Sequence, residues 1–273
     1  MSINPRFARV AAFGRARARP NRYAGAVLQR SRLHHRMAIA LLVTISACIV
    51  LAGCSASAAK PQARPAVTPI PCVTAPHVRG ARAGDVALTL VGGASSVVII
   101  SNEIGQDACQ WSDVAGDLTK AGLGVAMYDY STDTSYLRDL TAVLHYVRSH
   151  GAKHVTLLGA SIGAMASVVV GAAASPQPDA VVSLSSEPTA IGSHYVEEAA
   201  PKLHVPTLYA AADFDTEPAQ VIVDIKKLAP PGTATIIAAP GGAHGYALLF
   251  DADIRARVIA FVEDHTPGAN PPA

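Results

Sequence analysis

The chain has 273 residues, of which 50% are hydrophobic and 15% are charged. This composition excludes an intrinsically disordered chain and allows one sizeable core or two small ones. The formal net charge of +2 averages two unlike regions, because residues 1–53 hold nine of the 22 basic residues and none of the 20 acidic ones. The rest of the chain is therefore negative by seven charges. We expect no basic surface, and so no nucleic-acid partner, on the folded part.

Residues 1–53 are predicted to be an export signal. Three arginines between positions 30 and 36 precede an uncharged, mostly apolar run over 37–53, as in a signal peptide. This run is shorter than the roughly 20 apolar residues of a membrane span. It leads into Leu-Ala-Gly-Cys at positions 51–54. These four residues resemble the lipobox of bacterial lipoproteins, which implies lipidation of Cys54 and anchoring to the extracytoplasmic side of the cell membrane. An ordinary signal peptide and an uncleaved anchor helix are the alternatives.

Residues 54–84 are predicted to be a tether, and residues 85–273 the folded domain. Five prolines between positions 61 and 76 favour an extended chain, since proline fixes φ and lacks a backbone donor. The first acidic residue, Asp85, marks the expected start of the domain. Beyond Cys54, the mature chain holds only Cys72 and Cys109. An even pair in an exported protein predicts a disulfide, with two unpaired thiols as the alternative.

Strands and helices are predicted to alternate from residue 85 onward. Short β-branched runs predict buried strands, and apolar residues at helical spacing predict helices. The predicted strands cover 85–91, 97–100, 125–128, 155–158, 180–184, 207–211 and 234–238. The predicted helices cover 111–121, 136–150, 162–174, 218–228 and 254–265. This order indicates an α/β fold with a mostly parallel sheet, helices on both faces, and sites at the carboxyl ends of the strands.

Ser161 is the candidate nucleophile. It is the central residue of Gly-Ala-Ser-Ile-Gly at 159–163, a G-x-S-x-G pattern between a predicted strand and a predicted helix. Small neighbours allow the tight turn that exposes such a serine, and the helix N-terminus favours developing negative charge. The alternative is a glycine-rich turn with an incidental serine.

A serine nucleophile needs a base and an orienting acid. The strand–turn–helix context of the motif resembles that of α/β-hydrolases, and this resemblance implies that the partners follow the serine in the order acid, then histidine. His244 lies in a glycine-rich loop after the last predicted strand, and histidine side chains commonly transfer protons in catalysis. Asp215, after strand 207–211, is the preferred acid. Asp213 in the same loop and Glu187 after strand 180–184 are alternative acids. The alternative for each of these carboxylates is a structural role, either as a helix cap or as a solvated side chain at the surface.

The order of elements over 97–265 resembles an α/β-hydrolase core. Only about twenty residues separate strands 180–184 and 207–211, which leaves no room for a large lid domain. Trp111 and the segment Gly124–Tyr130 also resemble recurring features of this family. The resemblance implies an oxyanion hole built from two backbone N–H groups. One donor would be Ile162, and the other Glu103 or, next, Ile104.

The loop over 101–105 departs from the family pattern. Relatives often carry His-Gly there, whereas this chain has Ser-Asn-Glu-Ile-Gly. Backbone donors need no particular side chain, so activity can survive this change. The Glu103 carboxylate would nevertheless oppose an oxyanion unless it turns away or is paired.

The resemblance implies an enzyme that cleaves a carboxylic ester or a related acyl bond through an acyl-enzyme on Ser161. Its partner would be a small-molecule ester or acyl compound, and no cofactor or metal is implied. An acyltransferase with the same catalytic residues and a non-catalytic binding protein with the same fold are the alternatives. The sequence leaves the substrate and the oligomeric state open.

Overall fold

The computed structural model describes residues 66–73, 75, 77–93, 95–132, 134–189 and 195–269, all of which belong to one compact unit over residues 63–273. The predicted export signal, Cys54 and the tether up to residue 65 lie outside the described residues. No helix in the described ranges is long and apolar enough to cross a membrane.

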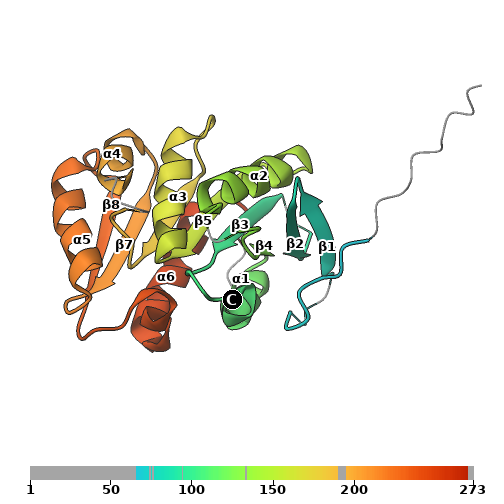
Figure 1. The fold of residues 1–273 in the computed structure, drawn as a ribbon, viewed down its shortest axis with the longest axis horizontal. Coiled ribbons are helices and arrows are strands. Elements are labelled where there is room, and N and C mark those ends of the chain that lie inside the picture. Colours follow the sequence, from blue (N-terminus) through green and yellow to red (C-terminus); the bar gives the residue numbers. More distant parts are fainter. Residues whose placement is uncertain are drawn as a thin grey trace, which may run out of the picture. The chain divides into compact units, whose positions relative to one another are not determined.

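An eight-stranded sheet forms the centre of this unit, with the strand order β1-β2-β4-β3-β5-β6-β7-β8 (Figure 1). The strands are β1 Arg79–Ala83, β2 Val86–Val91, β3 Ser96–Ser101, β4 Gly124–Tyr128, β5 His154–Ala160, β6 Ala180–Leu184, β7 Thr207–Ala212 and β8 Ala234–Ala239. β2 is antiparallel to both β1 and β4, and all other neighbours are parallel. The chain order reverses beside β3, which pairs with β4 on one side and β5 on the other. Such a reversal point opens a crevice at the carboxyl ends of the strands.

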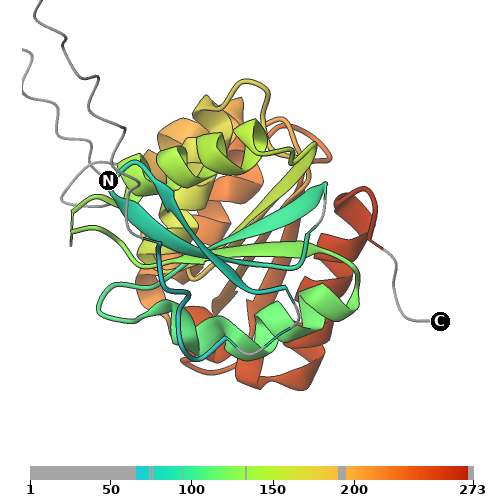
Figure 2. The same cartoon turned by 90° about the vertical axis from the view of Figure 1, so that its right-hand side faces the viewer.

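Helices cover both faces of the sheet. They are η1 Ala108–Trp111, α1 Ser112–Lys120, α2 Tyr136–Ser149, α3 Ile162–Ala173, α4 Tyr195–Ala199, η2 Ala200–Lys202, α5 Thr216–Leu228, η3 Gly245–Phe250 and α6 Ala252–His265. Figure 2 shows α2, α3 and α5 on one face and α1 and α6 on the other. The two hydrophobic clusters follow the same division, one containing residues of α2, α3 and α5 and the other residues of α1 and α6.

The central strands alternate their side chains between these two clusters. In β3, Val97 and Ile99 belong to the cluster under α2, α3 and α5, whereas Val98 and Ile100 belong to the one over α1 and α6. Successive side chains of a strand point to opposite faces, and a strand buried on both faces therefore has apolar residues at every position. This is why an uninterrupted β-branched run predicted β3 correctly.

The structure confirms each predicted strand and helix, with ends that differ by at most two residues. It also contains β1, which lies in the segment predicted to be a tether. β1 forms a hairpin with β2 through Gly84, whose φ of +61° suits glycine. The ordered sheet therefore starts before Asp85. Prolines prevent regular structure in the preceding segment, yet Ile70 still donates its N–H to Thr89 and packs against the core.

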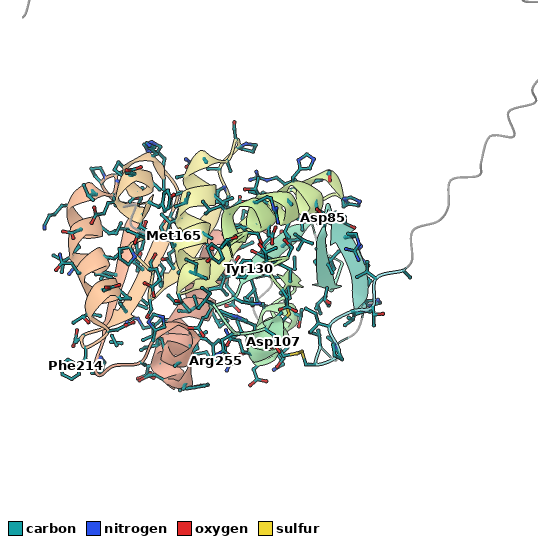
Figure 3. The ribbon with its side chains drawn as sticks, in the orientation of Figure 1. Asp85, Asp107, Tyr130, Met165, Phe214 and Arg255 are labelled. Atoms are coloured by element: carbon teal, nitrogen blue, oxygen red, sulfur yellow. A yellow bond between two sulfur atoms is a disulfide. The ribbon has the colours of Figure 1, made fainter. Side chains whose placement is uncertain are left out.

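The predicted disulfide between Cys72 and Cys109 is present, with Cα atoms 5.6 Å apart. It joins the segment before β1 to η1, and in Figure 3 it lies beside Asp107. Asp107 and Phe214, which follow β3 and β7, lie along the same lower edge of that view. Because both residues follow the carboxyl ends of parallel strands, they belong to the rim of the sheet that these ends form.

Candidate active site

Ser161 occupies the turn between β5 and α3. Its φ of 54° and ψ of −120° are unusual for a residue with a side chain, and such strain concentrates at functional sites. Its N–H donates to the carbonyl of Leu184 at 2.9 Å, which ties the turn to the end of β6. The residue is 6% exposed. The geometry is that of a nucleophile elbow, as the G-x-S-x-G pattern predicts.

The two glycines of the pattern are required by close packing. A Cβ on Gly159 would lie 2.1 Å from the carbonyl oxygen of Gly163. A Cβ on Gly163 would lie 2.3 Å from the carbonyl oxygen of Ser101 and 2.5 Å from that of Asn102. The start of α3 therefore touches the backbone of the loop that follows β3. This contact brings the turn and the predicted oxyanion loop together.

Replacing Gly163 with alanine is expected to destabilise the fold, because the added methyl group would meet backbone atoms. We expect a loss of about 3 kcal/mol, or a fall of about 6–12 °C in Tm, measured by thermal unfolding. The matched control is Gly116→Ala in α1, where an added Cβ meets nothing within 4 Å. This control should gain about 0.5–1 kcal/mol. Equal Tm values for the two variants would contradict the close packing described here.

His244 and Asp215 form a pair at the same rim. His244 follows β8, and Asp215 is the residue before α5. Nδ1 of His244 lies 3.0 Å from Oδ1 and 2.9 Å from Oδ2 of Asp215. The loops are joined by the N–H of Phe214, which donates to the carbonyl of Gly241 at 2.8 Å. A carboxylate at Nδ1 orients the ring and leaves Nε2 free to exchange a proton.

Glu187 lies between the serine and the histidine. Its Oε1 accepts a hydrogen bond from Oγ of Ser161 at 3.3 Å and lies 3.7 Å from Nε2 of His244. Ser161 and His244 therefore approach the same oxygen atom from two sides. The Glu187 side chain is 29% exposed, and that of His244 40%.

The three candidate acids thus have different positions. Asp215 contacts Nδ1 of His244, and Glu187 faces Nε2. Asp213 is exposed, and its backbone N–H donates to the carbonyl of Ala239. Among the described residues, Asp215 and Glu187 are the carboxylates within 4 Å of the His244 ring nitrogens. Of these two, only Asp215 occupies the position of an orienting acid.

The predicted oxyanion donors lie on the two segments that meet at Gly163. Ile162 is the first residue of α3, so its N–H has no partner within the helix and lies at the positive end of the helix dipole. Glu103 and Ile104 lie in the loop after β3, and the Ile104 side chain is 57% exposed. The loop after β3 and the start of α3 thus meet next to Ser161 at the rim.

The Glu103 carboxylate is paired with protein donors. Its Oε1 accepts the backbone N–H of Tyr246 at 2.9 Å, and its Oε2 accepts Nε2 of Gln110 at 3.4 Å. Gly245 permits this approach, since a Cβ at that position would overlap Glu103 Oε1. The carboxylate thereby links the loop after β3 to the segment that follows His244. This pairing meets the condition under which Glu103 is compatible with an oxyanion hole.

Sequence reasoning did not assign a role to the groups that hold the oxyanion loop. Asn102 donates its side-chain amide to the Tyr128 carbonyl at 3.0 Å and to Asp129 at 3.1 Å. The Tyr130 hydroxyl donates to the Asn102 carbonyl at 3.0 Å. Burial raises the pKa of Tyr128 and Tyr130 well above the usual value, so both hydroxyls stay protonated and Tyr130 can donate. The sequence signal for these loop contacts was the segment Gly124–Tyr130, which resembles a recurring feature of the α/β-hydrolase family.

Among the residues that the structure describes, no group of three or more His, Cys, Asp or Glu side chains is placed to hold a metal ion. The convergent groups are instead a hydroxyl, an imidazole and two carboxylates. This set can carry out proton transfer and nucleophilic attack on a carbonyl carbon.

Comparison with known proteins identifies the fold. No family model matches the chain, and no curated protein matches it. Among solved structures, a dienelactone hydrolase from Anabaena variabilis has a TM-score of 0.56 and 20% identity over 70% of this chain and 97% of that one. A monoacylglycerol lipase from Paleococcus ferrophilus has a TM-score of 0.56 and 11% identity over 65% and 98%. A proline iminopeptidase from Mycobacterium smegmatis has a TM-score of 0.55 and 12% identity over 69% and 98%. The chain therefore has the α/β-hydrolase fold.

Proposed function

We propose that this chain is a serine hydrolase that cleaves a carboxylic ester or a related acyl bond. The observation that carries the proposal is the convergence of the strained Ser161 turn with the His244–Asp215 pair at the carboxyl ends of the strands. Oγ of Ser161 and Nε2 of His244 lie 3.3 and 3.7 Å from the same oxygen atom. The structural neighbours, which include a lipase and a lactone hydrolase, support a hydrolytic reaction.

The reaction begins when Oγ of Ser161 attacks the substrate's carbonyl carbon. His244 Nε2 takes the hydroxyl proton, and Asp215 stabilises the resulting imidazolium through Nδ1. The resting hydroxyl donates to Glu187, so it must first turn from that carboxylate towards Nε2. Catalytic hydrogen bonds often align only when substrate binds.

The oxyanion of the tetrahedral intermediate accepts hydrogen bonds from the N–H groups of Ile162 and Glu103. The carbon–oxygen bond to the leaving alcohol then breaks, and His244 returns its proton to that oxygen. Water then gives a proton to His244 and attacks the acyl carbon, the bond from this carbon to Oγ of Ser161 breaks, and His244 returns the proton to Oγ as the acid is released. The Glu103 carboxylate is hydrogen-bonded to the N–H of Tyr246 and takes no part in this step. This pairing weakens the argument for a non-catalytic protein.

The experiment that tests this function is turnover of small esters together with labelling by a serine-directed fluorophosphonate. Both signals should depend on Ser161. An unlabelled chain that hydrolyses no ester in a broad panel would contradict the proposal.

We also propose that the enzyme is anchored by a lipid on Cys54 at the extracytoplasmic face of the membrane. The lipobox-like residues 51–54 and the basic and apolar regions before them support this. A disulfide in the described domain agrees with an oxidising compartment. The proline-rich tether would hold the domain off the membrane.

Replacing Cys54 with alanine in the full chain is expected to abolish fatty-acid attachment, because the acylated thiol is removed. Labelled fatty acid should no longer enter the protein, and the protein should leave the membrane fraction. The control is Cys48→Ala in the same N-terminal region, which should change neither signal. Equal incorporation of fatty acid in both variants would be incompatible with lipidation of Cys54.

A further inference from the structure

The Glu187 carboxylate faces the nucleophile from a fixed position. Ser185, two residues before it, is buried, has a φ of 47° and donates its N–H to the carbonyl of Ala210 at 2.7 Å. Ser186 is also buried. These residues hold the turn at the end of β6, which also accepts the N–H of Ser161 through Leu184. Glu187 is thus placed by the same backbone that places the nucleophile.

Among the described residues, the charge partner of this carboxylate is a histidine and not a permanent cation. Within the described part of the chain, no lysine or arginine forms an ion pair with Glu187, and its ionic neighbour is His244. His244 must be neutral to accept the proton from Ser161. An imidazolium between Asp215 and Glu187 would be stabilised by both carboxylates but could not act as the base. In the working site, the described residues therefore give the Glu187 carboxylate no cationic partner beside the attacking oxygen.

A bound substrate must be compatible with the negative charge of the Glu187 carboxylate. Its carbonyl carbon must come within about 3–3.5 Å of Oγ, so the neighbouring atoms lie close to Glu187. A neutral apolar group would remove water from the carboxylate without replacing its hydrogen bonds, and an anionic group would be repelled. A cationic group would instead pair with the carboxylate and release both Ser161 and His244 from it. It would also offset the unfavourable field of Glu187 at the oxyanion.

We propose that Glu187 selects acyl substrates that carry a positive charge next to the scissile bond. This inference rests on the proposed hydrolase function and specifies its substrate class. The net negative charge of the chain beyond residue 53 favours the approach of such substrates. Glu187 is then a specificity-determining residue, whereas Asp215 orients the base.

The test compares esters that differ only in charge. One pair is a choline ester and its uncharged isostere, in which carbon replaces the quaternary nitrogen. A second pair places the same quaternary group, or its carbon isostere, in the acyl chain. Quaternary ammonium groups keep their charge at every pH, so a preference cannot come from titration of the substrate. For the full-length protein, we expect kcat/KM for the cationic member of at least one pair to be higher by about tenfold, or about 1.4 kcal/mol.

The decisive variant is Glu187→Gln, which keeps the shape and an acceptor oxygen but removes the charge. Its cationic-to-neutral ratio of kcat/KM should fall to about one, because the cationic ester loses the charge that favours it. The matched control is Glu217→Gln, which removes an exposed carboxylate in the first turn of α5 and should keep the wild-type ratio. A wild-type ratio near one, or an unchanged ratio in Glu187→Gln, would overturn the proposal. Equal loss of both activities would also overturn it and would indicate a catalytic role.

A second readout does not depend on turnover. A tetraalkylammonium ion should slow fluorophosphonate labelling of the wild type more than its neutral carbon isostere does, and Glu187→Gln should remove this difference. Charge-selective protection without any ester hydrolysis would support the cation site and contradict the proposed hydrolase. Ester hydrolysis without charge-selective protection or preference would support the hydrolase and contradict the cation site.

Discussion

Replacing Ser161 with alanine is expected to abolish fluorophosphonate labelling and to lower ester turnover by about 10³-fold or more. The reason is that the strained turn presents this hydroxyl to the Glu187 oxygen that His244 also faces, and alanine offers no atom that can form the acyl-enzyme. The measurement is in-gel fluorescence after probe treatment, with initial rates on the same preparation.

The control for this variant is Ser167→Ala in α3, the helix that follows Ser161. Ser167 is buried and donates its hydroxyl to the carbonyl of Gly163 at 2.8 Å, which makes it a structural serine. This variant should be labelled like the wild type, and thermal unfolding should show that both variants are folded. Labelling of a folded Ser161→Ala variant at the wild-type level would mean that another residue is the nucleophile.

Replacing Asp215 with asparagine is expected to lower kcat by about 10³- to 10⁴-fold while the protein stays folded. Both carboxylate oxygens lie within 3.0 Å of Nδ1 of His244. An asparagine can donate to Nδ1, which favours the imidazole tautomer with a proton on Nε2, and this tautomer cannot accept the proton from Ser161. The measurement is steady-state kinetics with a small ester.

The matched control is Asp213→Asn, which removes the same charge two residues earlier. The Asp213 side chain is exposed, and the residue contributes a backbone hydrogen bond to Ala239 that the substitution preserves. We expect kcat within about threefold of the wild type, as for most surface changes. A larger loss in Asp213→Asn than in Asp215→Asn would reassign the acid.

The two glutamates at the rim illustrate why a carboxylate in a sequence is hard to interpret. Glu103 looked unfavourable for an oxyanion hole, yet its oxygens are engaged by Tyr246 and Gln110. Glu187 looked like an alternative to Asp215, yet it faces the opposite side of the imidazole ring. The partners of Glu103 include a residue 143 positions away along the chain. No local sequence pattern predicts this partner, because the packing of the loops determines which donors reach the carboxylate.

The amino-acid sequence by itself determined the α/β order, the strand and helix positions and the elbow at Ser161. These features depend on local chemistry: apolar periodicity, glycines at close backbone contacts, and a proline-rich segment before the domain. The hairpin strand β1 was missed because Arg79–Ala83 contains small and charged residues rather than a β-branched run. Its strand conformation comes from pairing with β2.

Only the tertiary structure decided which carboxylate meets which nitrogen of His244, and which donors hydrogen-bond to the Glu103 carboxylate. It placed the ends of β5, β6, β7 and β8 and the loop after β3 along one rim, so that residues distant in sequence share one site. The physical reason is that a parallel sheet brings the carboxyl ends of all its parallel strands to the same edge. The final geometry of the side chains is then set by loop packing and hydrogen bonds between segments that sequence periodicity does not encode.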